Sequence, residues 1–324
     1  MKTCSFEGNF RYLKANKSNF PKISIITPVF NTGKFVLRLL RSIQYQHFNS
    51  IEIILIDDCS IDNSLELIKK YQIEDCRIRI IKNKNNKGTF ASRNIGILKS
   101  KGIYIMFPDS DDILLENSLK YFYNFSIKHD YELLRYNLYQ GQGKTVLDFI
   151  TKKLKSRPIY QPELTTYLFY GFGYLAQIDF NVSSKFIKKE ALIRALNVIP
   201  KTDLFIYMST FEDQLLNYFL YRTAKSLYFL NRFGYYYIRN NALKPGYKKG
   251  YLHSKMKNIF IYITYVFNYS KNTKYEKDMS NRLFANLIYK KGINPLISFI
   301  NNQPNFVNNI INTLNANEFF ADKN

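Results

Sequence analysis

The sequence is poor in the residues that build disulfide frameworks and histidine metal sites. Its 324 residues include three cysteines, three histidines and no tryptophan. Cys4, Cys59 and Cys76 lack the short spacings of a zinc site. A sparse, odd number of cysteines is typical of a reducing compartment and not of small secreted domains held by disulfides. The scattered histidines do not predict a shared metal site.

Long apolar runs are also absent. The first residues, "MKTCSFEGNFRYLKANKSNF", lack the apolar core of a signal peptide. The longest later run, "IFIYITYVF" at 259–267, is far shorter than the ~20 residues that span a bilayer. We therefore expect a cytoplasmic protein, and peripheral attachment to the inner face of the membrane stays open.

Negative charge is scarce, because 47 Lys and Arg stand against 25 Asp and Glu, a net charge of +22. Such a surplus attracts nucleic acid, anionic membrane or phosphorylated substrates, and composition alone does not choose among them. A generally basic surface without such a partner is the alternative. No nucleic-acid-binding signature is found, so we expect no nucleic-acid partner. The hydrophobic fraction of 46% argues against disorder.

Between residues 22 and 112, apolar β-branched segments alternate with segments of helical spacing. Strands are expected at 22–30, 51–58, 77–83 and 102–112, and helices at 33–46, 60–72 and 88–101. Ser60 or Asp62 is the expected N-cap of the second helix. Continuously hydrophobic strands that alternate with helices predict an α/β fold, with a mostly parallel central sheet and helices on both faces.

The alternation fades after residue 141. The basic segment 141–162 suggests a connection or surface element. Residues 180–196 suggest a strand or loop that leads into a helix, 210–224 a helix, and 226–241 an aromatic strand. The remainder, 242–324, is polar, rich in Asn and helical in pattern.

Nucleotide-binding loops rich in glycine are missing. No G-x-G-x-x-G follows the first predicted strand, and no P-loop is present, which disfavours a dinucleotide-binding Rossmann domain and a P-loop enzyme. Ligands of parallel sheets bind beyond the carboxyl ends of the strands. Here those ends read "TPVFN", "IDDCS", "IKNKN" and "FPDSDD", so polar and acidic residues gather at the expected ligand edge.

The densest acidic group is Asp109, Asp111 and Asp112, directly after the apolar run "GIYIMF". Grouped carboxylates suit a hard divalent cation, which is typically held by one or two carboxylates and substrate phosphates. Without a cation these like charges would raise one another's pKa. The alternative is an N-cap for a helix that begins near Ile113, although a cap uses only one acid.

Three other places could carry chemistry. Asp57 and Asp58 could bind a nucleobase or ribose, or could only form a turn. Arg93 near a helix N-terminus could reach a phosphate or base, or could be an exposed helical residue. Glu212 or Asp213 could be a general base, or both could be acids favoured by the helix macrodipole.

The segments "ISIITPVFN…LIDDCS", "NKGTFASRNIG", "FPDSDD", "SSKFIKKEAL" and "FEDQLL" together resemble family 2 glycosyltransferases of the GT-A fold in order and spacing. The resemblance is specific from Lys22 to Asp112 and thinner to about Arg239; residues 242–324 resemble nothing known to us. It implies a GT-A domain at 22–240. The polar residues 1–21 are expected to be an N-terminal leader, and the basic, helical pattern at 241–324 predicts a C-terminal extension.

The resemblance implies a nucleotide-diphosphate sugar donor, most simply a UDP-sugar, Mn²⁺ or Mg²⁺ as cofactor, and inversion at the anomeric carbon. By it, Asp213 is the catalytic base, with Glu212 and Arg239 in support. Asp111 and Asp109 are the metal ligands, supported by Asp112. The implied nucleotide-sugar-binding residues are Thr27, Pro28, Phe30, Asn31, Asp57, Asp58, Arg93, Asp109 and Ser110.

Some features depart from the family pattern or leave alternatives. After Arg239 the sequence has no Ser or His at the places where family members often carry them, and Cys59 stands where Gly is common. Bacterial members commonly build lipopolysaccharide, capsule or other surface glycans on lipid-linked acceptors. The basic C-terminal region suits an anionic membrane surface or, equally, a helical cap. A non-catalytic sugar-nucleotide binding module and a nucleotidyltransferase are the competing functions.

Overall fold

The computed structural model describes residues 20–142, 145–149, 156–161, 163–164, 181–238, 258, 261–262 and 265–266. The chain forms two compact units, Met1–Pro245 and Gly246–Asn324, and the elements given below belong to the first. The expected division at 240/241 and the leader stay predictions. Arg239 and nearly all of the expected helical extension lie outside the described residues.

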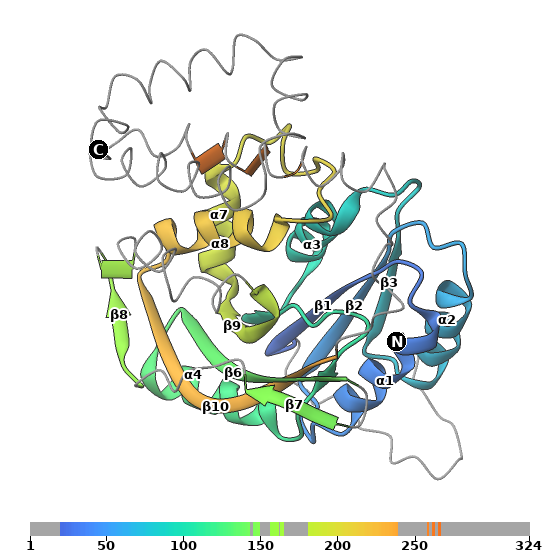
Figure 1. The fold of residues 1–324 in the computed structure, drawn as a ribbon, viewed down its shortest axis with the longest axis horizontal. Coiled ribbons are helices and arrows are strands. Elements are labelled where there is room, and N and C mark those ends of the chain that lie inside the picture. Colours follow the sequence, from blue (N-terminus) through green and yellow to red (C-terminus); the bar gives the residue numbers. More distant parts are fainter. Residues whose placement is uncertain are drawn as a thin grey trace, which may run out of the picture. The chain divides into compact units, whose positions relative to one another are not determined.

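The first half of the sheet is parallel, as predicted (Figure 1). Its strands, in the spatial order β3-β2-β1-β4, are β1 (Ile23–Val29), β2 (Ile51–Asp57), β3 (Ile78–Lys82) and β4 (Tyr104–Met106). The intervening helices are α1 (Gly33–Gln44), α2 (Ser64–Glu74) and α3 (Gly88–Lys99). The alternation read from the sequence is confirmed.

The second half makes the sheet mixed, in the order β3-β2-β1-β4-β9-β6-β10-β5 with β7 and β8 beside that path. Its strands are β5 (Ile113–Leu114), β6 (Leu133–Gln142), β7 (Thr145–Phe149), β8 (Pro158–Tyr160), β9 (Lys185–Lys188) and β10 (Ser226–Ile238). The helices are α4 (Ser118–His129), the 3-10 turn η1 (Val182–Ser184), α7 (Lys189–Val198) and α8 (Glu212–Thr223). β9 is antiparallel to β4 and β6, whereas β10 is parallel to β6.

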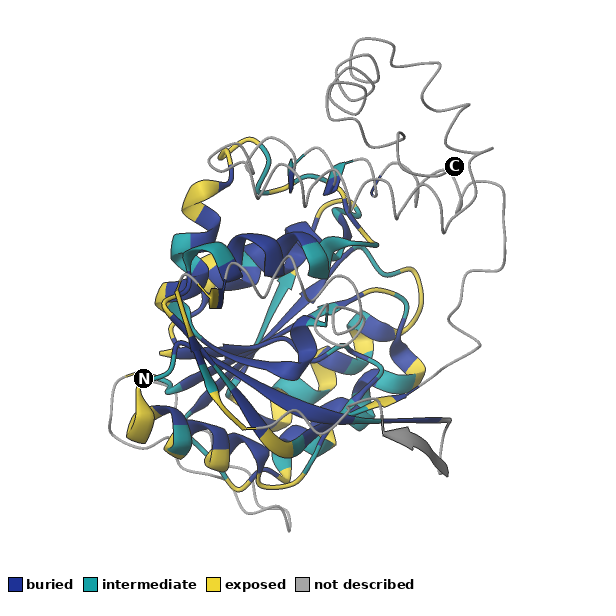
Figure 2. Cartoon of the chain, turned by 60° about the vertical axis from the view of Figure 1, so that its left-hand side comes forward, coloured by how far each residue is buried: buried dark blue, intermediate teal, exposed yellow. Residues whose placement is uncertain are grey.

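The strands at the centre are buried because helices cover both faces of the sheet (Figure 2). On one face, residues of α1, α2 and α4 join a single apolar cluster with β1 and β2, through side chains such as Leu39, Ile68 and Phe122. On the other face α3 packs close to the strands, since a methyl group added at Gly96 would meet Ile26. Because the helices cover the faces and not the edge, the polar carboxyl ends of the strands lie at an edge of the sheet that the helices leave open.

Two boundaries differ from the sequence prediction. The fourth strand ends at Met106 instead of continuing to 112, so residues 107–112 form a turn. No helix begins near Ile113: β5 occupies that place and α4 begins at Ser118. The interpretation of the acids as a helix N-cap is therefore wrong.

The second helix begins at Ser64, after the N-cap residue Asn63, and not at residue 60. The Asp62 carboxylate instead accepts hydrogen bonds from the main-chain N–H groups of Ser64 and Gly33, so it ties the loop to the start of α1. Cys59 has φ 67°, a left-handed conformation that favours glycine. The unusual cysteine noted in the sequence therefore occupies a real turn position.

Candidate active site

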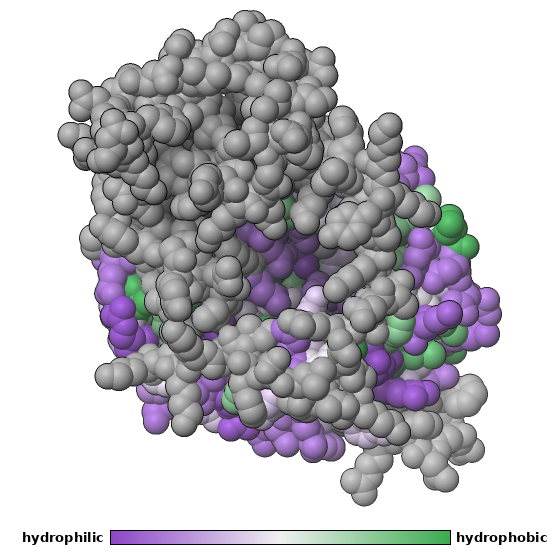
Figure 3. Space-filling model, viewed as in Figure 1, coloured by the Kyte–Doolittle hydropathy of each residue, from purple (hydrophilic) through white to green (hydrophobic). Residues whose placement is uncertain are grey.

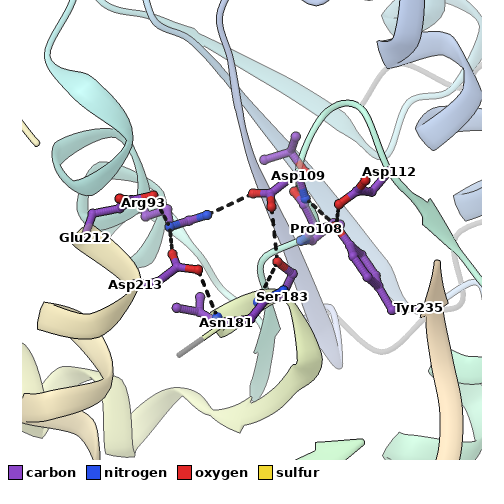
Figure 4. Close-up of polar contacts among 11 residues, drawn as sticks. Arg93, Pro108, Asp109, Asp112, Asn181, Ser183, Glu212, Asp213 and Tyr235 are labelled. Carbon is purple, nitrogen blue, oxygen red and sulfur yellow. Dashed lines mark hydrogen bonds and ion pairs between the residues drawn. The ribbon is translucent and has the colours of Figure 1, made fainter. Parts of the chain in front are cut away.

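The site lies beyond the carboxyl ends of β1, β2 and β4, where the start of α8 and the turn η1 also arrive (Figure 4). The parallel registers Val29↔Asp57 and Ile25↔Met106 bring those strand ends to one edge. The Thr27 hydroxyl donates a hydrogen bond of 2.9 Å to the Pro108 carbonyl, which fastens the 107–112 turn to the first strand.

Arg93 on α3 is the centre of the site. Its side chain is 3% exposed, and its Nη2 donates to Asp109 Oδ1 at 2.9 Å. Its Nη1 donates to Asp213 and lies 3.5 Å from Glu212 Oε1. One buried guanidinium therefore joins the 107–112 turn to the first turn of α8. The sequence offered a phosphate or base as the partner of Arg93, and the described residues place three carboxylates around it.

The turn η1 contacts two of these acids, Asp109 and Asp213. The main-chain N–H of Val182 donates to Asp213 Oδ2 at 3.2 Å. The Ser183 Oγ lies 3.2 Å from Asp109 Oδ2. Neither residue was predicted to belong to the site. The segment that begins at Ser183 entered only as part of the resemblance, and nothing in "NVSSKF" marks a hydroxyl that contacts an acid distant in the chain. Asp109 and Asp213 are thus held from two sides.

Asp112 lies beneath the turn and not at its surface. Its side chain is fully buried, and its carboxylate accepts hydrogen bonds from the Tyr235 hydroxyl at 2.7 Å and from the Ile238 N–H at 2.8 Å. Burial, then the charges of Asp109 and Asp111, raise its pKa well above the usual value. Asp112 is placed to support the turn, as a buried acid with two fixed donors.

Negative charge exceeds positive charge at this site. Burial raises the pKa of Asp109 to about 6, against the opposing effect of Arg93. Burial and the neighbouring Asp213 raise the pKa of Glu212 to about 7. Although burial by itself would lower the pKa of Arg93, the charges of Asp213, Asp109 and Glu212 outweigh it and raise that pKa. A further cation would relieve the excess.

This excess predicts a pH dependence of stability. Between its ordinary pKa of 4.5 and its folded value of about 7, Glu212 keeps a proton that the unfolded chain has released. In metal-free buffer, the contribution of Glu212 to the free energy of unfolding is therefore complete below about pH 4.5 and is lost as the pH rises to about 7. We expect Glu212→Gln to flatten the fall in Tm between about pH 5 and about pH 8, measured by thermal denaturation with a chelator.

Glu66→Gln is the matched control, because Glu66 is an exposed side chain beside Lys70, which lowers its pKa. It should leave the slope of Tm against pH close to that of the parent chain. An unchanged slope in Glu212→Gln would contradict the proton assigned to Glu212.

The residues present fit a hard divalent cation that also binds phosphate. Asp111 is partly exposed at the turn, and its main-chain carbonyl accepts a hydrogen bond of 2.6 Å from Arg38 Nη2. Within the described segments, no three His, Cys, Asp or Glu side chains converge into a complete metal site. A cation that takes one or two carboxylates and completes its shell with diphosphate and water matches this donor set.

The expected nucleotide side of the site has a defined loop structure. Asn31 has φ 52°, its N–H donates to Ser60 Oγ at 3.2 Å, and its Oδ1 accepts from the Ile61 N–H at 2.9 Å. Phe30 is 46% exposed and Pro28 is partly exposed. These residues thus border solvent at the end of β1, where a planar ligand could lie on the ring. Ser110, by contrast, is buried within the acidic turn.

Asp58 is engaged by the protein. It is 3% exposed, and its carboxylate accepts from Asn83 Nδ2 at 2.7 Å and from the N–H groups of Lys87 and Gly88, both at 2.8 Å. Asp57 is fully buried, and its Oδ2 has no hydrogen-bond partner among the described residues. Asp58 therefore orders the loop before α3, whereas Asp57 Oδ1 accepts a hydrogen bond of 3.3 Å from the Ser60 N–H in the loop after β2. The contact of either acid with a nucleobase stays a prediction.

The start of α3 packs directly on the segment that precedes Asp213. Gly88 has φ +80°, and a Cβ at that position would lie 2.6 Å from the Met208 carbonyl oxygen. The Phe90 N–H donates to that same carbonyl at 3.1 Å, and Asn94 Nδ2 donates to the Leu204 carbonyl at 2.8 Å. The helix that carries Arg93 and the segment that leads to Asp213 are thus fixed to one another.

The visible described surface in Figure 3 is mainly hydrophilic, with apolar residues in small separate groups. Among the residues that the structure describes, none of the helices combines the length and apolarity needed to cross a bilayer.

The sheet, the carboxylate turn after β4 and the acidic pair at the start of α8 form the arrangement that the resemblance to GT-A glycosyltransferases predicts, and solved GT-A structures share this fold. The model of Glycosyl transferase family 2 matches residues 24–192. Glycosyltransferase GlyG of Streptococcus pneumoniae is 30% identical over 228 residues, which are 68% of this chain and 71% of GlyG. The chain belongs to glycosyl transferase family 2.

Two other relatives are matched over smaller parts of their length, and a solved structure shares the fold. The GalNAc(5)-diNAcBac-PP-undecaprenol β-1,3-glucosyltransferase of Campylobacter jejuni is 37% identical over 100 residues, 31% of this chain and 32% of that enzyme. The poly(ribitol-phosphate) β-N-acetylglucosaminyltransferase TarS of Staphylococcus aureus is 26% identical over 219 residues, 67% of this chain but only 35% of TarS. The structure of TarS residues 1–349 with UDP has a TM-score of 0.58 and 22% identity, covering 83% of this chain and 72% of that one. This likeness confirms the fold.

Proposed function

We propose that this chain transfers a sugar from a UDP-sugar to an acceptor hydroxyl with inversion at the anomeric carbon. Asp213 is the general base in this proposal, and Asp111, with Asp109, holds Mn²⁺ or Mg²⁺. The observation that carries it is the Arg93 bridge: Asp213 and Asp109 bind the same guanidinium. Arg93 thus has the proposed base on one side and the proposed metal-binding turn on the other. This arrangement suits a reaction in which the acceptor loses a proton close to where the donor loses its diphosphate.

In this mechanism Asp213 takes the proton of the acceptor hydroxyl while the acceptor oxygen attacks the anomeric carbon of the donor. The bond from that carbon to the donor diphosphate breaks, and its electron pair leaves with the diphosphate. A single displacement inverts the configuration. Arg93 and the Val182 N–H hold the Asp213 carboxylate in place throughout. When bound, the cation supplies neutralisation of the departing charge.

The names of relatives support the substrate classes. TarS has been solved with UDP and with UDP-GlcNAc, which favours a uridine donor. Its name gives poly(ribitol-phosphate) as the acceptor, whereas the Campylobacter enzyme acts on a glycan linked to PP-undecaprenol. We therefore propose an acceptor in a bacterial surface glycan, such as lipopolysaccharide or capsule, that is either polymeric or lipid-linked.

The test is a donor panel. UDP- and GDP-sugars are incubated singly with the full chain and Mn²⁺ or Mg²⁺, with and without simple glycoside acceptors, and the released nucleotide diphosphate is measured. We expect UDP release from one donor, which a chelator stops and excess metal restores. Tight donor binding without any release would favour a non-catalytic module. Pyrophosphate formation from UTP and a sugar phosphate would favour a nucleotidyltransferase.

A position on the inner face of the membrane is a separate part of the proposal. The net charge of +22 and the lipid-linked acceptor of one relative support it. Flotation with liposomes that contain anionic lipid at low salt tests it, and liposomes of neutral lipid are the control. Failure to float with either would remove membrane binding from the proposal while leaving glycosyl transfer intact.

A further inference from the structure

The acidic turn 107–112 is attached to a strand that comes much later in the chain, through a hydroxyl that bonds on two sides. The Tyr235 oxygen accepts a hydrogen bond of 2.9 Å from the Asp109 N–H and donates one of 2.7 Å to Asp112 Oδ2. The Ile238 N–H donates to the other Asp112 oxygen at 2.8 Å. Figure 4 shows Tyr235 reaching the turn on the side away from Arg93.

The surrounding packing makes this contact a fixed one. Tyr235 and Asp112 are both fully buried. The turn closes on itself through the Asp112 N–H, which donates to the Asp109 carbonyl at 3.2 Å. Directly after the turn, β5 pairs with β10 in the register Tyr235↔Leu114. The Tyr235 hydroxyl and this strand pairing therefore hold the two ends of the turn against β10.

The chemistry of the contact requires a hydroxyl. The Asp109 N–H needs an acceptor, and Asp112 Oδ2 needs a donor, and a phenol provides both through one oxygen. Phenylalanine would fill the same space but would leave a buried N–H and a buried carboxylate oxygen without these partners, which is costly in a low-dielectric interior. The turn could recover hydrogen bonds only by moving toward solvent, and its carboxylates would move with it.

We propose that Tyr235 is a positioning residue that, through Asp112, holds Asp109 and Asp111 in the arrangement that binds the divalent cation and the donor diphosphate. This inference rests on the proposed function. Tyr235 itself lies too deep to contact a substrate, so it acts through the turn. Because Asp112 also fixes Ile238, the same contacts couple the turn to the end of β10, directly before Arg239 in the sequence.

The test is Tyr235→Phe in the full chain, with Mn²⁺ as the probe. Mn²⁺ binding in the presence of UDP is followed by the electron paramagnetic resonance signal of the unbound ion, at a temperature well below the Tm of every variant. Loss of a partner behind metal ligands typically costs about 10–100-fold in metal affinity or activity, so we expect at least about a 10-fold weaker Mn²⁺ affinity. Half-saturating Mn²⁺ for sugar transfer should rise in parallel.

Two further variants separate positioning from general stability. Tyr104→Phe removes the hydroxyl of a nearly buried tyrosine on β4 that makes no hydrogen bond to a described residue, and it should leave Mn²⁺ affinity unchanged. Asp112→Asn should weaken Mn²⁺ binding, and combined with Tyr235→Phe it should add less than the sum of the single effects, since both act through one contact.

Failure of the positioning role of Tyr235 can be distinguished from failure of the proposed transferase function. If the parent chain binds Mn²⁺ with UDP and Tyr235→Phe binds it equally well, the positioning role is overturned and the transferase proposal stands. Additive effects of the two substitutions would also overturn it. If the parent chain neither binds Mn²⁺ with UDP nor turns over any donor, the proposed function itself fails. Should Tyr235→Phe not fold, normal Mn²⁺ affinity in Asp112→Asn would overturn the inference.

Discussion

Asp213→Asn is expected to lower the rate of sugar transfer by about 10²–10⁴-fold, which is the usual contribution of a positioned general base. Asparagine has almost the same shape and keeps one oxygen acceptor for Arg93 or the Val182 N–H, so the fold around α8 should persist. It cannot take the proton of the acceptor hydroxyl. We therefore expect the loss in kcat, while the affinity for UDP with Mn²⁺ changes little.

The measurement is steady-state transfer with the donor found in the panel, together with calorimetric binding of UDP. Asp130→Asn is the matched control, because Asp130 is an aspartate with a side chain 81% exposed at the end of α4. That variant should transfer at the parental rate. An Asp213→Asn chain that turns over normally would remove Asp213 from the role of base, and an equal loss of UDP binding would point to a structural role.

Asp111→Ala should nearly abolish transfer, through loss of the cation and not of the fold. Stabilisation of a departing diphosphate by a bound cation is worth several kcal/mol, so a loss of about 10²-fold or more is expected. The repulsion among the acids predicts a second result. Because the Asp111 charge helps to raise the pKa of Asp109 and Asp112, its removal relieves the turn. The metal-free Tm should therefore stay level or increase.

This pair of results is diagnostic, since a damaged fold would lower both activity and Tm. Transfer is measured across a Mn²⁺ titration, and Tm is measured with a chelator and again with Mn²⁺ and UDP. The parent chain should gain Tm on adding Mn²⁺ and UDP, whereas Asp111→Ala should gain little. Glu116→Ala, with a side chain 67% exposed, is the control and should keep both responses. Full activity in Asp111→Ala would assign the metal to other residues.

Much of the fold was predictable because hydrophobic periodicity is a local property of the sequence. The first three parallel strands and the three helices lie within a few residues of their expected places. The errors fall where side chains bond across loops. The Asp62 carboxylate bonds both to the start of α1 and to the Ser64 N–H, while Asn63 is the N-cap residue of α2. The fourth strand ends at Met106, before "FPDSDD". Hydrophobic periodicity does not predict hydrogen bonds between side chains and distant loops.

The site was predictable in part. Among the expected site residues, the structure brings four into contact from distant segments: Arg93, Asp109, Glu212 and Asp213. Their roles in the reaction stay predictions. The geometry of their partners was not predictable. Arg93 faces Asp109, Glu212 and Asp213, and the Asp58 carboxylate is satisfied by three donors of the protein. Which ligand atoms these side chains also contact stays a prediction.

The sequence by itself determined the parallel half of the sheet and the family, because both follow from residue type and spacing along one stretch of chain. Only the tertiary structure decided that Arg93 joins the 107–112 turn to Asp213, that Ser183 lies beside Asp109, and that Tyr235 bonds to Asp112. These contacts join residues from 16 to 123 positions apart, across strands and helices whose order in space differs from their order in the chain. A buried charge or N–H group needs a hydrogen-bonding partner, and which residue provides it depends on how the sheet and helices pack together.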